Sequence, residues 1–484
     1  MADRHLPGED VIGGSASGIK GPNRARTTAL IVACALFMQN LDSTVISTAL
    51  PTMARAFGEE PVRMNVALTS YLLSLAVFIP MSGWMADRFG ARTVFRAAIL
   101  VFTFGSVLCG RAETLPFLVG ARILQGIGGA MMVPVGRLLL LRTAAKSELV
   151  AAMAWLSAPA LIGPVVGPPV GGFIVDHFSW PWIFDINVPI GLVGFCLVTI
   201  YIPDVREEGR VRLDFTGLVL SGVSLACLMV GFETAGRGMV DSSLSAVMLG
   251  TGVLAGLVYA WHARRVPAPL LDFTLLRIPT FMVSVVAGTL FRVGIGAVPF
   301  LLPLMLQIGF GYTATQSGLV TFASSAGAIL MKPAAMTALR RFGFRRTLIA
   351  NSVLSGAFLL LIAFFRPSWP LAAIYATLLV GGFFRSLQFT SFNTLAFADI
   401  PRERMSSATS LYSTIQQVSL TLGVTVGAAT LEIAMSTTGS SQPSLMDFSV
   451  GFVVVAMCLL AAAPIPMLMP REAGAEMSGQ RLKR

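Results

Sequence analysis

The sequence predicts an all-helical protein that crosses a membrane many times. Hydrophobic residues make up 55% of the 484 residues and charged residues only 12%, whereas an ordinary soluble domain carries about twice this charged fraction. The mean hydropathy is +0.76. A helix needs about 20 apolar residues to cross a bilayer, and fourteen stretches are long enough. These stretches are centred near residues 38, 74, 102, 127, 160, 192, 223, 252, 292, 325, 355, 383, 420 and 458.

Basic residues are distributed unevenly between the two sides of these spans. If the N-terminus is cytoplasmic, most of the 35 Lys and Arg residues fall in cytoplasmic segments. The outer segments contain only Arg55, Arg63, Arg111, Arg237 and Arg366. Cytoplasmic loops of membrane proteins carry such an excess, so we expect both termini inside and an even number of spans. The net charge of +11 therefore indicates membrane topology and not nucleic-acid binding.

The sequence lacks the motifs of several other function classes. It contains no GxxxxGK[ST] phosphate loop and no GxSxG nucleophile elbow, which mark P-loop NTPases and many serine hydrolases. The five cysteines are scattered through apolar stretches, and there are only three histidines. This pattern indicates neither a disulfide framework nor a metal site. We therefore expect a protein that is not an enzyme and that uses no cofactor.

Two polar breaks, at residues 204–214 and 262–277, divide the chain into six, two and six spans. The other loops are short, which leaves no room for a sizeable soluble domain. We expect a cytoplasmic tail at 1–26, a six-helix bundle at 27–203, two linker helices with their flanking loops at 204–275, a second six-helix bundle at 276–470 and a cytoplasmic tail at 471–484.

An internal repeat supports this division. The connection after the second span reads GWMADRFGART, from Gly83 to Thr93, and LRRFGFRRT, from Leu339 to Thr347, occupies the corresponding place in the second bundle. Both are basic turns that contain a glycine, but the second copy lacks the acidic residue. Transporters with two repeated six-helix halves carry their substrate site between the halves.

The segment Gly163 to Gly172, GPVVGPPVGG, departs most from ordinary helix propensity, because glycine and proline are poor helix formers. Gly163, Gly167 and Gly171 are spaced by four residues, which leaves one helix face bare and allows close packing. Two interpretations follow. The segment is either a tightly packed structural helix or a bend about which a bundle changes shape.

Asp42 is the strongest candidate for a functional charge inside a span. Burying an ionisable residue in a bilayer costs roughly 2.5–3.5 kcal/mol even on lenient scales, so such residues are functional candidates by default. Counted back from Pro51 at about 1.5 Å per residue, Asp42 lies roughly 12–14 Å below the outer end of the first span. Arg122 lies about 12 Å into the fourth span, which runs the opposite way. We therefore expect both side chains at one level.

A carboxylate beside an arginine at this depth can act as a proton site. Low dielectric favours the neutral acid, whereas a nearby positive charge favours the carboxylate. Moving Arg122, or wetting the pocket, would therefore switch Asp42 between holding and releasing a proton. The alternative interpretation is a static buried ion pair.

Other polar residues within the spans are candidates for a cavity lining, although interhelical hydrogen bonding explains them almost as well. They are Gln39, Asn40, Gln125, Arg292, Arg385, Gln388 and Gln416. Arg137 and Lys332 lie near cytoplasmic ends, where we expect them to snorkel. Because Asp42 is the only deep acid among several arginines, we expect the cavity to favour neutral, zwitterionic or anionic amphiphiles over dications.

Five motifs in order carry a resemblance to a known family. They are Leu41–Pro51 (LDSTVISTALP), Gly83–Thr93, Arg122–Ala130 (RILQGIGGA), Gly163–Gly172 and Trp182–Gly191 (WIFDINVPIG). Through them the chain, over about residues 27–470, resembles the major facilitator superfamily, in particular its fourteen-span drug:proton antiporters of the EmrB/QacA type. Met85, Pro181 and Asp185 depart from the residues usual in these motifs.

The resemblance implies the major facilitator fold, with two six-helix bundles, two extra linker helices and a cycle of alternating access. It implies a cytoplasmic gate that locks the outward-facing state, formed by Gly83, Asp87, Arg88, Gly90 and Arg92. The alternative interpretation is a solvated basic turn that serves only membrane topology. It also implies an antiporter motif, formed by Gly163, Gly167, Pro168, Gly171 and Gly172.

The function implied by this resemblance is export of drugs or other amphiphilic small molecules in exchange for protons. The proton gradient would drive it across a bacterial inner membrane. A proton-coupled uptake symporter of the same fold remains an alternative, as does a transporter-like membrane sensor. Whether a periplasmic adaptor protein extends the export path is left open by the sequence.

Overall fold

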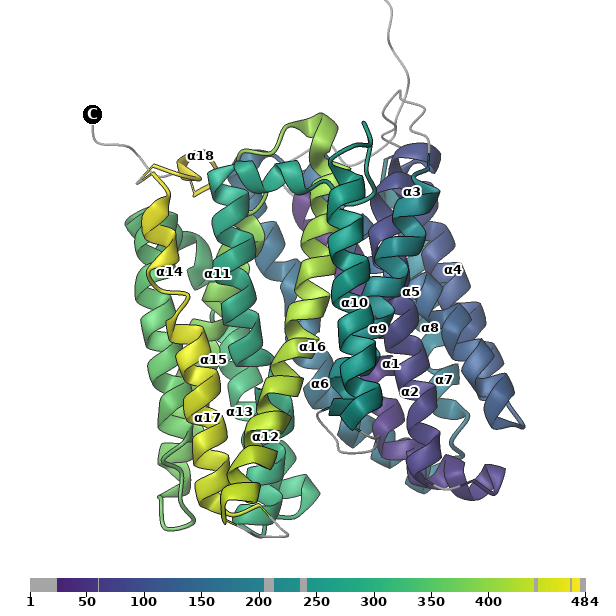
Figure 1. Ribbon diagram of the computed structural model, residues 1–484, viewed down its shortest axis with the longest axis vertical. Coiled ribbons are helices and arrows are strands. Elements are labelled where there is room, and N and C mark those ends of the chain that lie inside the picture. The colour runs from purple at the N-terminus through teal and green to yellow at the C-terminus, as the bar shows by residue number, and fades with distance from the viewer. Residues whose placement is uncertain are drawn as a thin grey trace, which may run out of the picture.

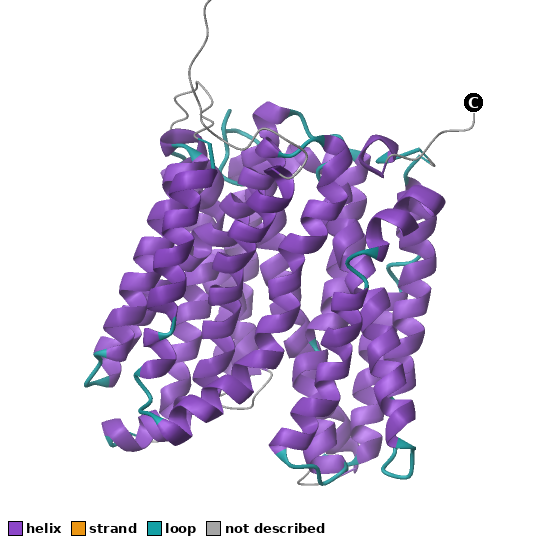
Figure 2. Cartoon of the chain, turned by 180° about the vertical axis from the view of Figure 1, so that it is seen from behind, coloured by secondary structure: helices purple, strands orange, loops and turns teal. Residues whose placement is uncertain are grey.

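The computed structural model describes residues 24–59, 61–203, 213–235, 242–438, 443–470 and 472–478, and the regular structure in these ranges is helical throughout (Figure 2). Most of the predicted tails, 1–26 and 471–484, lie outside the described residues, as does most of the polar break at 204–214. The elements in chain order are α1 (Arg24–Phe57), α2 (Pro61–Phe78), η1 (Ile79–Met81), α3 (Ser82–Phe89), α4 (Ala91–Gly110), α5 (Leu115–Thr143), η2 (Lys146–Glu148), α6 (Leu149–His177), α7 (Trp182–Asp185), α8 (Asn187–Tyr201), α9 (Phe215–Ala235), α10 (Ser242–Ala263), η3 (Phe273–Arg277), α11 (Pro279–Gly296), α12 (Val298–Leu304), η4 (Met305–Gly309), α13 (Ala314–Leu330), α14 (Ala334–Ile362), α15 (Leu371–Leu395), η5 (Arg402–Arg404), α16 (Met405–Thr438), α17 (Leu445–Leu460), η6 (Ile465–Leu468) and α18 (Ala475–Ser478).

Within the described ranges, 12 helical segments are long and apolar enough to cross a membrane. They account for twelve of the fourteen predicted stretches. The other two stretches, near residues 160 and 325, coincide with α6 and α13. The all-helical membrane architecture is therefore confirmed, and the number fourteen stays a prediction.

The helices form two groups joined by a pair. In Figure 1 most of the helices α1 to α8, coloured purple to blue, lie on one side, and most of α11 to α17, coloured teal to yellow, lie on the other, while α6 and α16 lie near the middle. We call these the N-terminal helices and the C-terminal helices. The pair α9 and α10 packs together, and α9 contacts both α2 and α16. The end of the molecule at which α3 and α18 lie, uppermost in Figure 1, is called the α18 face below.

The internal repeat has a counterpart in the backbone. Gly90 separates α3 from α4 with φ 86°, and Gly343 interrupts α14 with φ 71°. Residues with side chains rarely adopt such positive φ values, so a glycine at each turn has a conformational reason. Both turns also follow a short break in the preceding span, at Ile79–Met81 and at Met331–Pro333. The basic turns predicted from the sequence are therefore turns of similar design.

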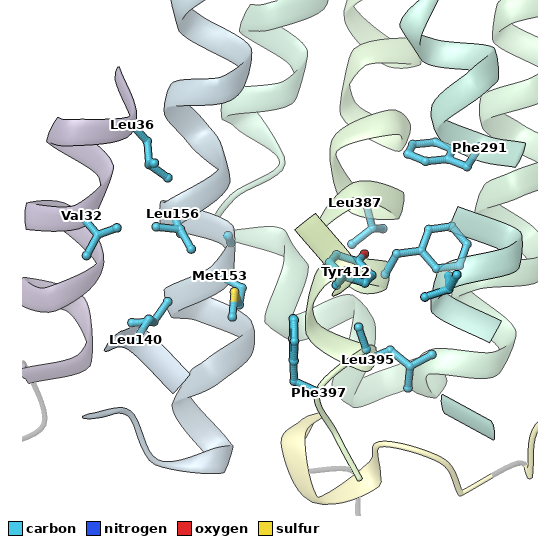
Figure 3. Packing of buried hydrophobic residues seen from close by; sticks show 14 of the residues in the cluster. Val32, Leu36, Leu140, Met153, Leu156, Phe291, Leu387, Leu395, Phe397 and Tyr412 are labelled. Atoms are coloured by element: carbon cyan, nitrogen blue, oxygen red, sulfur yellow. The ribbon is translucent and has the colours of Figure 1, made fainter. Parts of the chain in front are cut away.

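Buried side chains from both groups of helices join in one hydrophobic cluster. Figure 3 shows Leu140 and Met153 of the N-terminal helices, and Leu395 and Tyr412 of the C-terminal helices, within it. The two groups therefore meet across an apolar layer as well as through the polar contacts described next.

Candidate ion-pair site and inter-group contacts

Asp42 lies on α1, and both oxygens of its carboxylate accept hydrogen bonds. One oxygen, Oδ2, accepts from Arg122 at 2.6 Å. The other, Oδ1, accepts from the amides of Gln125 and Asn187, each at 2.9 Å. Asp42 and these three partners are all buried. The sequence arithmetic, which places Asp42 and Arg122 at one depth, agrees with this contact.

Arg122 is held from several helices at once. Its Nε donates to the Ala67 carbonyl oxygen on α2 at 3.2 Å, and its guanidinium carbon lies 4.2 Å from the centre of the Tyr71 ring. The guanidinium also donates to Oε1 of Gln125 at 2.6 Å. Gln125 therefore bridges the pair, because it accepts from Arg122 and donates to Asp42. These contacts hold the Arg122 side chain in place, and Asp42 depends on Arg122 for its charged hydrogen-bond partner.

Asn187 is a partner that the sequence reasoning missed. It begins α8, and its Nδ2 donates both to Asp42 and to Ser106 Oγ on α4, the latter at 3.0 Å. Ser106 in turn donates to the Phe184 carbonyl oxygen at 2.9 Å. A signal was present, because Asn187 lies within the Trp182–Gly191 motif. Nothing in the sequence, however, indicates that its side chain turns toward α1.

The donors around Asp42 leave neither oxygen of its carboxylate without an N–H partner. Both carboxylate oxygens accept N–H groups, so a proton added to either oxygen would compete with a donor already in place. Removing one partner of such a buried pair is expensive, about 3–5 kcal/mol, because it leaves an uncompensated charge. Of the three donors to Asp42, Arg122 is the charged one, so its removal would be the most costly.

The glycine motif of α6 packs against the same part of α1. The α6 helix is continuous from Leu149 to His177. A methyl group on Gly163 would lie 2.7 Å from Cβ of Asn40, and one on Gly167 would overlap the Thr44 hydroxyl. Of the two interpretations of this segment, the close-packing face is confirmed. A bend that drives the transport cycle stays a prediction.

The second half of the motif, from Pro168 to Gly172, has fewer close contacts. Gly171 is buried, whereas a methyl group on Gly172 would meet nothing within 4 Å. Pro168 lies within the helix between Gly167 and Gly171. The packing constraint thus acts on the first half of the motif, beside Asp42.

Asp87 connects the two groups of helices at the α18 face. Its carboxylate accepts from Arg142 on α5 at 3.1 Å, and also from the Ser406 hydroxyl on α16. One turn further along α16, the Ser410 hydroxyl donates to the Pro80 carbonyl oxygen at 2.6 Å. A methyl group on Gly83 would lie 2.8 Å from the Ser406 carbonyl oxygen. At this face α3 therefore packs closely against the backbone of α16, around the carboxylate of Asp87.

The remaining predicted gate residues lie apart from this contact. Arg88 is exposed and, within the described residues, makes no hydrogen bond or ion pair. Arg92 donates to the Thr199 carbonyl oxygen at the end of α8, which lies among the N-terminal helices. Gly90 forms the turn described above. The structure thus brings Asp87 and Gly83 against α16, but not Arg88 or Arg92.

The predicted cavity residues separate into several groups. Gln39 and Asn40 lie on α1, where Asn40 faces Gly163. Among the C-terminal helices, Gln388 donates to Ser352 on α14 at 2.7 Å, and Arg385 donates to Ser324 on α13. Arg292 donates to the hydroxyl of Tyr412, and Gln416 accepts from Arg137 at 3.0 Å. Interhelical hydrogen bonding thus accounts for Gln388 and Arg385.

The expectation that Arg137 and Lys332 snorkel to the membrane surface is wrong. Both residues are buried, with 4% and 6% of their surfaces exposed. Arg137 turns toward α16, where it donates to Ser413 and Gln416. The physical reason is that a residue near a helix end snorkels only if it faces lipid, whereas the inner face of α5 is covered by α16.

Two groups of membrane helices with related turns and a buried ion pair in one group define a polytopic membrane protein of the transporter class. A sequence model of the Major Facilitator Superfamily matches residues 32–424. The chain belongs to the major facilitator superfamily. It is therefore a multi-pass membrane transporter and not an enzyme.

Relatives of this chain occur in several bacteria. A protein of Citrobacter koseri named "Putative multidrug resistance protein MdtD" is 40% identical over 412 residues, which cover 85% of this chain and 87% of that protein. A protein of the same name from Serratia proteamaculans is 37% identical over 451 residues, covering 90% and 92%. The similarity thus extends over most of both chains.

Solved structures with the same fold are more distant in sequence. The human organic anion transporter MFSD10 (TETRAN) superimposes with a TM-score of 0.65 at 14% identity, covering 92% of this chain and all of that one. The proton:xylose symporter XylE superimposes with a TM-score of 0.64, also at 14% identity, covering 93% and 97%. At this identity the likeness concerns the fold alone.

Proposed function

We propose that this protein is a proton-coupled antiporter that exports drugs or other amphiphilic small molecules by alternating access. The observation that carries the proposal is the buried pair of Asp42 and Arg122, with side chains 1% and 0% exposed. A charge pair at this depth costs solvation free energy and is a functional candidate by default. The name that the bacterial relatives carry, a putative multidrug resistance protein, supports export of drugs.

The proposal includes fourteen spans. Beyond the 12 candidate spans, α6 has 29 residues and α13 has 17. The two helices pack along α1 and α15, which are candidate spans themselves, and this supports counting them as crossings. The domains would then be bundles at 27–203 and 276–470, with the linker helices at 204–275 between them.

The excess of basic residues in alternate loops supports cytoplasmic termini, which would place the α18 face in the cytoplasm of a bacterial cell. In that orientation the contacts of Asp87, Ser406 and Ser410 close the cytoplasmic side, as in an outward-facing state. Asp42 would then exchange protons with the outside. Separation of α3 and α5 from α16 would open the other side.

The coupling step would be an exchange of partners at Asp42. While Arg122 and the two amides donate to the carboxylate, the ionised form is favoured. A shift of α5 or α8 that draws Arg122 or Asn187 away would favour the protonated acid instead. The proton would be released on the cytoplasmic side when these donors return. Substrate leaves the cell in the same cycle.

Purified protein in proteoliposomes provides the test. An imposed proton gradient should drive uptake of a fluorescent amphiphile into inside-out liposomes, coupled to proton movement in the opposite direction. Asp42→Asn should abolish the gradient-driven flux, because the amide cannot carry the proton. Asp447→Asn is the matched control, because the hydrogen bonds of Asp447 within the described residues are those with Ser444 that cap α17.

Three results would contradict the proposal. Unchanged gradient-driven flux in Asp42→Asn would remove Asp42 as the coupling residue. Proton and amphiphile movement in the same direction would instead identify an uptake symporter. No flux of any amphiphile under any gradient would favour a transporter-like sensor.

A further inference from the structure

Two arginines from opposite groups of helices lie beside one tyrosine. Arg137 belongs to α5 and Arg292 to α11, and both side chains are buried. Their guanidinium carbons lie 5.1 Å and 4.7 Å from the centre of the Tyr412 ring on α16. One aromatic side chain thus contacts two positive charges at the boundary between the N-terminal and C-terminal helices.

The partners of these two arginines are neutral. Arg137 donates to Ser413 Oγ at 3.2 Å and to Gln416 Oε1 at 3.0 Å, and Arg292 donates to the Tyr412 hydroxyl. Neither arginine forms an ion pair within the described residues. In the same ranges, Nε of both and one terminal nitrogen of Arg292 lack any acceptor, although they are buried. Donors are therefore available with no acceptor from the chain.

Two buried cations without a counter-charge are electrostatically unfavourable. An isolated buried charge costs several kcal/mol, and like charges repel more strongly in a low dielectric than in water. Arg122 shows how this chain compensates a buried arginine, because Asp42 contacts it at 2.6 Å. At Tyr412 the corresponding acid is absent from the described residues. The component that would complete this group of side chains is an anion.

We propose that Arg137 and Arg292 bind the acidic group of an amphiphilic substrate, a carboxylate, sulfonate or phosphate, beside Tyr412. The inference rests on the proposed export function and specifies its substrate class. Guanidinium groups match such oxyanions because their planar N–H donors bind two oxygens at once. The unpaired nitrogens of both arginines supply these donors.

The surrounding rings suit the apolar part of such a substrate. Phe397 and Phe281 lie 5.4 Å and 6.3 Å from Tyr412, measured between ring centres. Aromatic pairs at these separations attract each other beyond simple burial. An aromatic acid would therefore find contacts for its ring as well as for its charge.

The position of the site links it to the transport cycle. Arg137 contacts α16 one to two turns inward from Ser410, where α16 meets Pro80 at the α18 face. Opening of this face would separate Arg137 from Ser413 and Gln416 and expose its donors to an entering anion. When the face closes again, Ser413 and Gln416 return as competing acceptors. They would displace the anion toward the other side.

Two probes that differ in charge test the proposal. Naphthalene-2-sulfonate is an anion, and naphthalene-2-sulfonamide has nearly the same shape without the charge. Calorimetric titration of the purified full-length protein at neutral pH should show tighter binding of the sulfonate. Arg137→Gln and Arg292→Gln should each weaken sulfonate binding by about tenfold or more, the range expected for a lost charged hydrogen bond. Sulfonamide binding should change little.

A matched control and a conservative variant separate charge from folding. Arg366→Gln removes an arginine that donates to Ser449 and to the Phe365 carbonyl oxygen in the turn after α14, and it should leave both affinities unchanged. Arg292→Lys keeps the charge but loses the planar donors, so its sulfonate affinity should be intermediate. Sulfonamide binding by each variant reports that the protein is folded.

Several results would overturn the proposal. They are equal affinity for the two probes in the unaltered protein, no detectable sulfonate binding, and equal losses for both probes in the glutamine variants. In the last case the arginines only hold the helices together. Failure of the export function is distinguishable, because the sulfonate preference would persist while a proton gradient drives no flux.

Discussion

Thr44 donates a hydrogen bond over 3.2 Å to the carbonyl oxygen of Gly163, and this bond ties α6 to the turn of α1 that carries Asp42. Gly163 and Gly167 bring the α6 backbone against Asn40 and Thr44. A shift of α6 would therefore move the residues on either side of Asp42. The glycine motif therefore packs against the same turn of α1 that carries Asp42.

The first prediction concerns this packing face. Gly163→Ala should lower both stability and proton-driven flux, because the added methyl group would lie 2.7 Å from Asn40 Cβ. Overpacking of this kind costs about 1–3 kcal/mol. Gly172→Ala is the control, since nothing lies within 4 Å of its added methyl group, and alanine favours a helix. Thermal unfolding and liposome flux measure the effect; equal behaviour of the two variants would refute it.

The second prediction concerns Asn187. Asn187→Leu removes one of two amide donors to Asp42 Oδ1, so we expect a loss of about 1–3 kcal/mol in stability and a marked loss of gradient-driven flux. Asn351→Leu is the matched control. It removes a buried amide that donates to the Phe384 carbonyl oxygen at 2.7 Å, so it should cost similar stability but spare proton coupling. If both variants lose coupling equally, Asn187 has no specific role.

The third prediction concerns closure of the α18 face. Asp87→Asn replaces the acid that accepts from Arg142 and Ser406, and it should favour the open state by about 1–3 kcal/mol, the value of a charged hydrogen bond. A cysteine introduced at Ser410, in a background without native cysteines, should then react faster with a thiol reagent. Arg88→Gln should leave this rate unchanged, because Arg88 is exposed. A faster rate in Arg88→Gln as well would contradict the assignment.

The fourth prediction is a pH dependence. Burial alone would raise the pKa of Asp272, but hydrogen bonds from Thr274 and Arg404 outweigh it and hold this pKa below its usual value. Because the pKa is lower in the folded state than the ordinary value of about 3.9, the stabilisation is present at neutral pH. It is lost as the pH falls through the folded-state pKa.

Asp272→Asn should therefore lower the unfolding temperature at neutral pH, and its difference from the unaltered protein should shrink below about pH 4. The effect should not exceed about 1 kcal/mol, since the Arg404 side chain is 38% exposed and solvent weakens such pairs. Glu476→Gln should have no measurable effect at either pH, because Glu476 and its partner Lys146 are both exposed. A pH-independent loss in Asp272→Asn would show that packing, not charge, holds this contact.

Helix positions along the chain could be predicted because apolar length and rise per residue are fixed quantities. The rise per residue alone places Asp42 and Arg122 at one level, and the structure has them in contact. The glycine spacing likewise predicts a close-packing face. These features depend on distance along one helix and not on its neighbours.

The partners across helices could not be predicted, because a single sequence does not give the rotation of each helix about its axis. Asn187 lies in a motif, yet only packing turns it toward Asp42. For the same reason the sequence predicts Arg137 at the lipid surface, whereas the structure turns it toward α16. The grouping of Arg137, Arg292 and Tyr412 depends on three helices that are far apart in the chain.

The ion pairs around the α18 face differ in their contact with water. Arg142 and Asp87 have only 7% and 19% of their side chains exposed, whereas Lys146 and Glu476 stand in solvent. Dissolved ions screen charges over about 8 Å at physiological ionic strength, but they act weakly on pairs that they cannot approach. Added salt should therefore weaken the ion pair of Lys146 and Glu476 and leave the ion pair of Arg142 and Asp87 nearly unchanged. The balance between open and closed states at this face would then stay nearly constant as a cell's salinity changes.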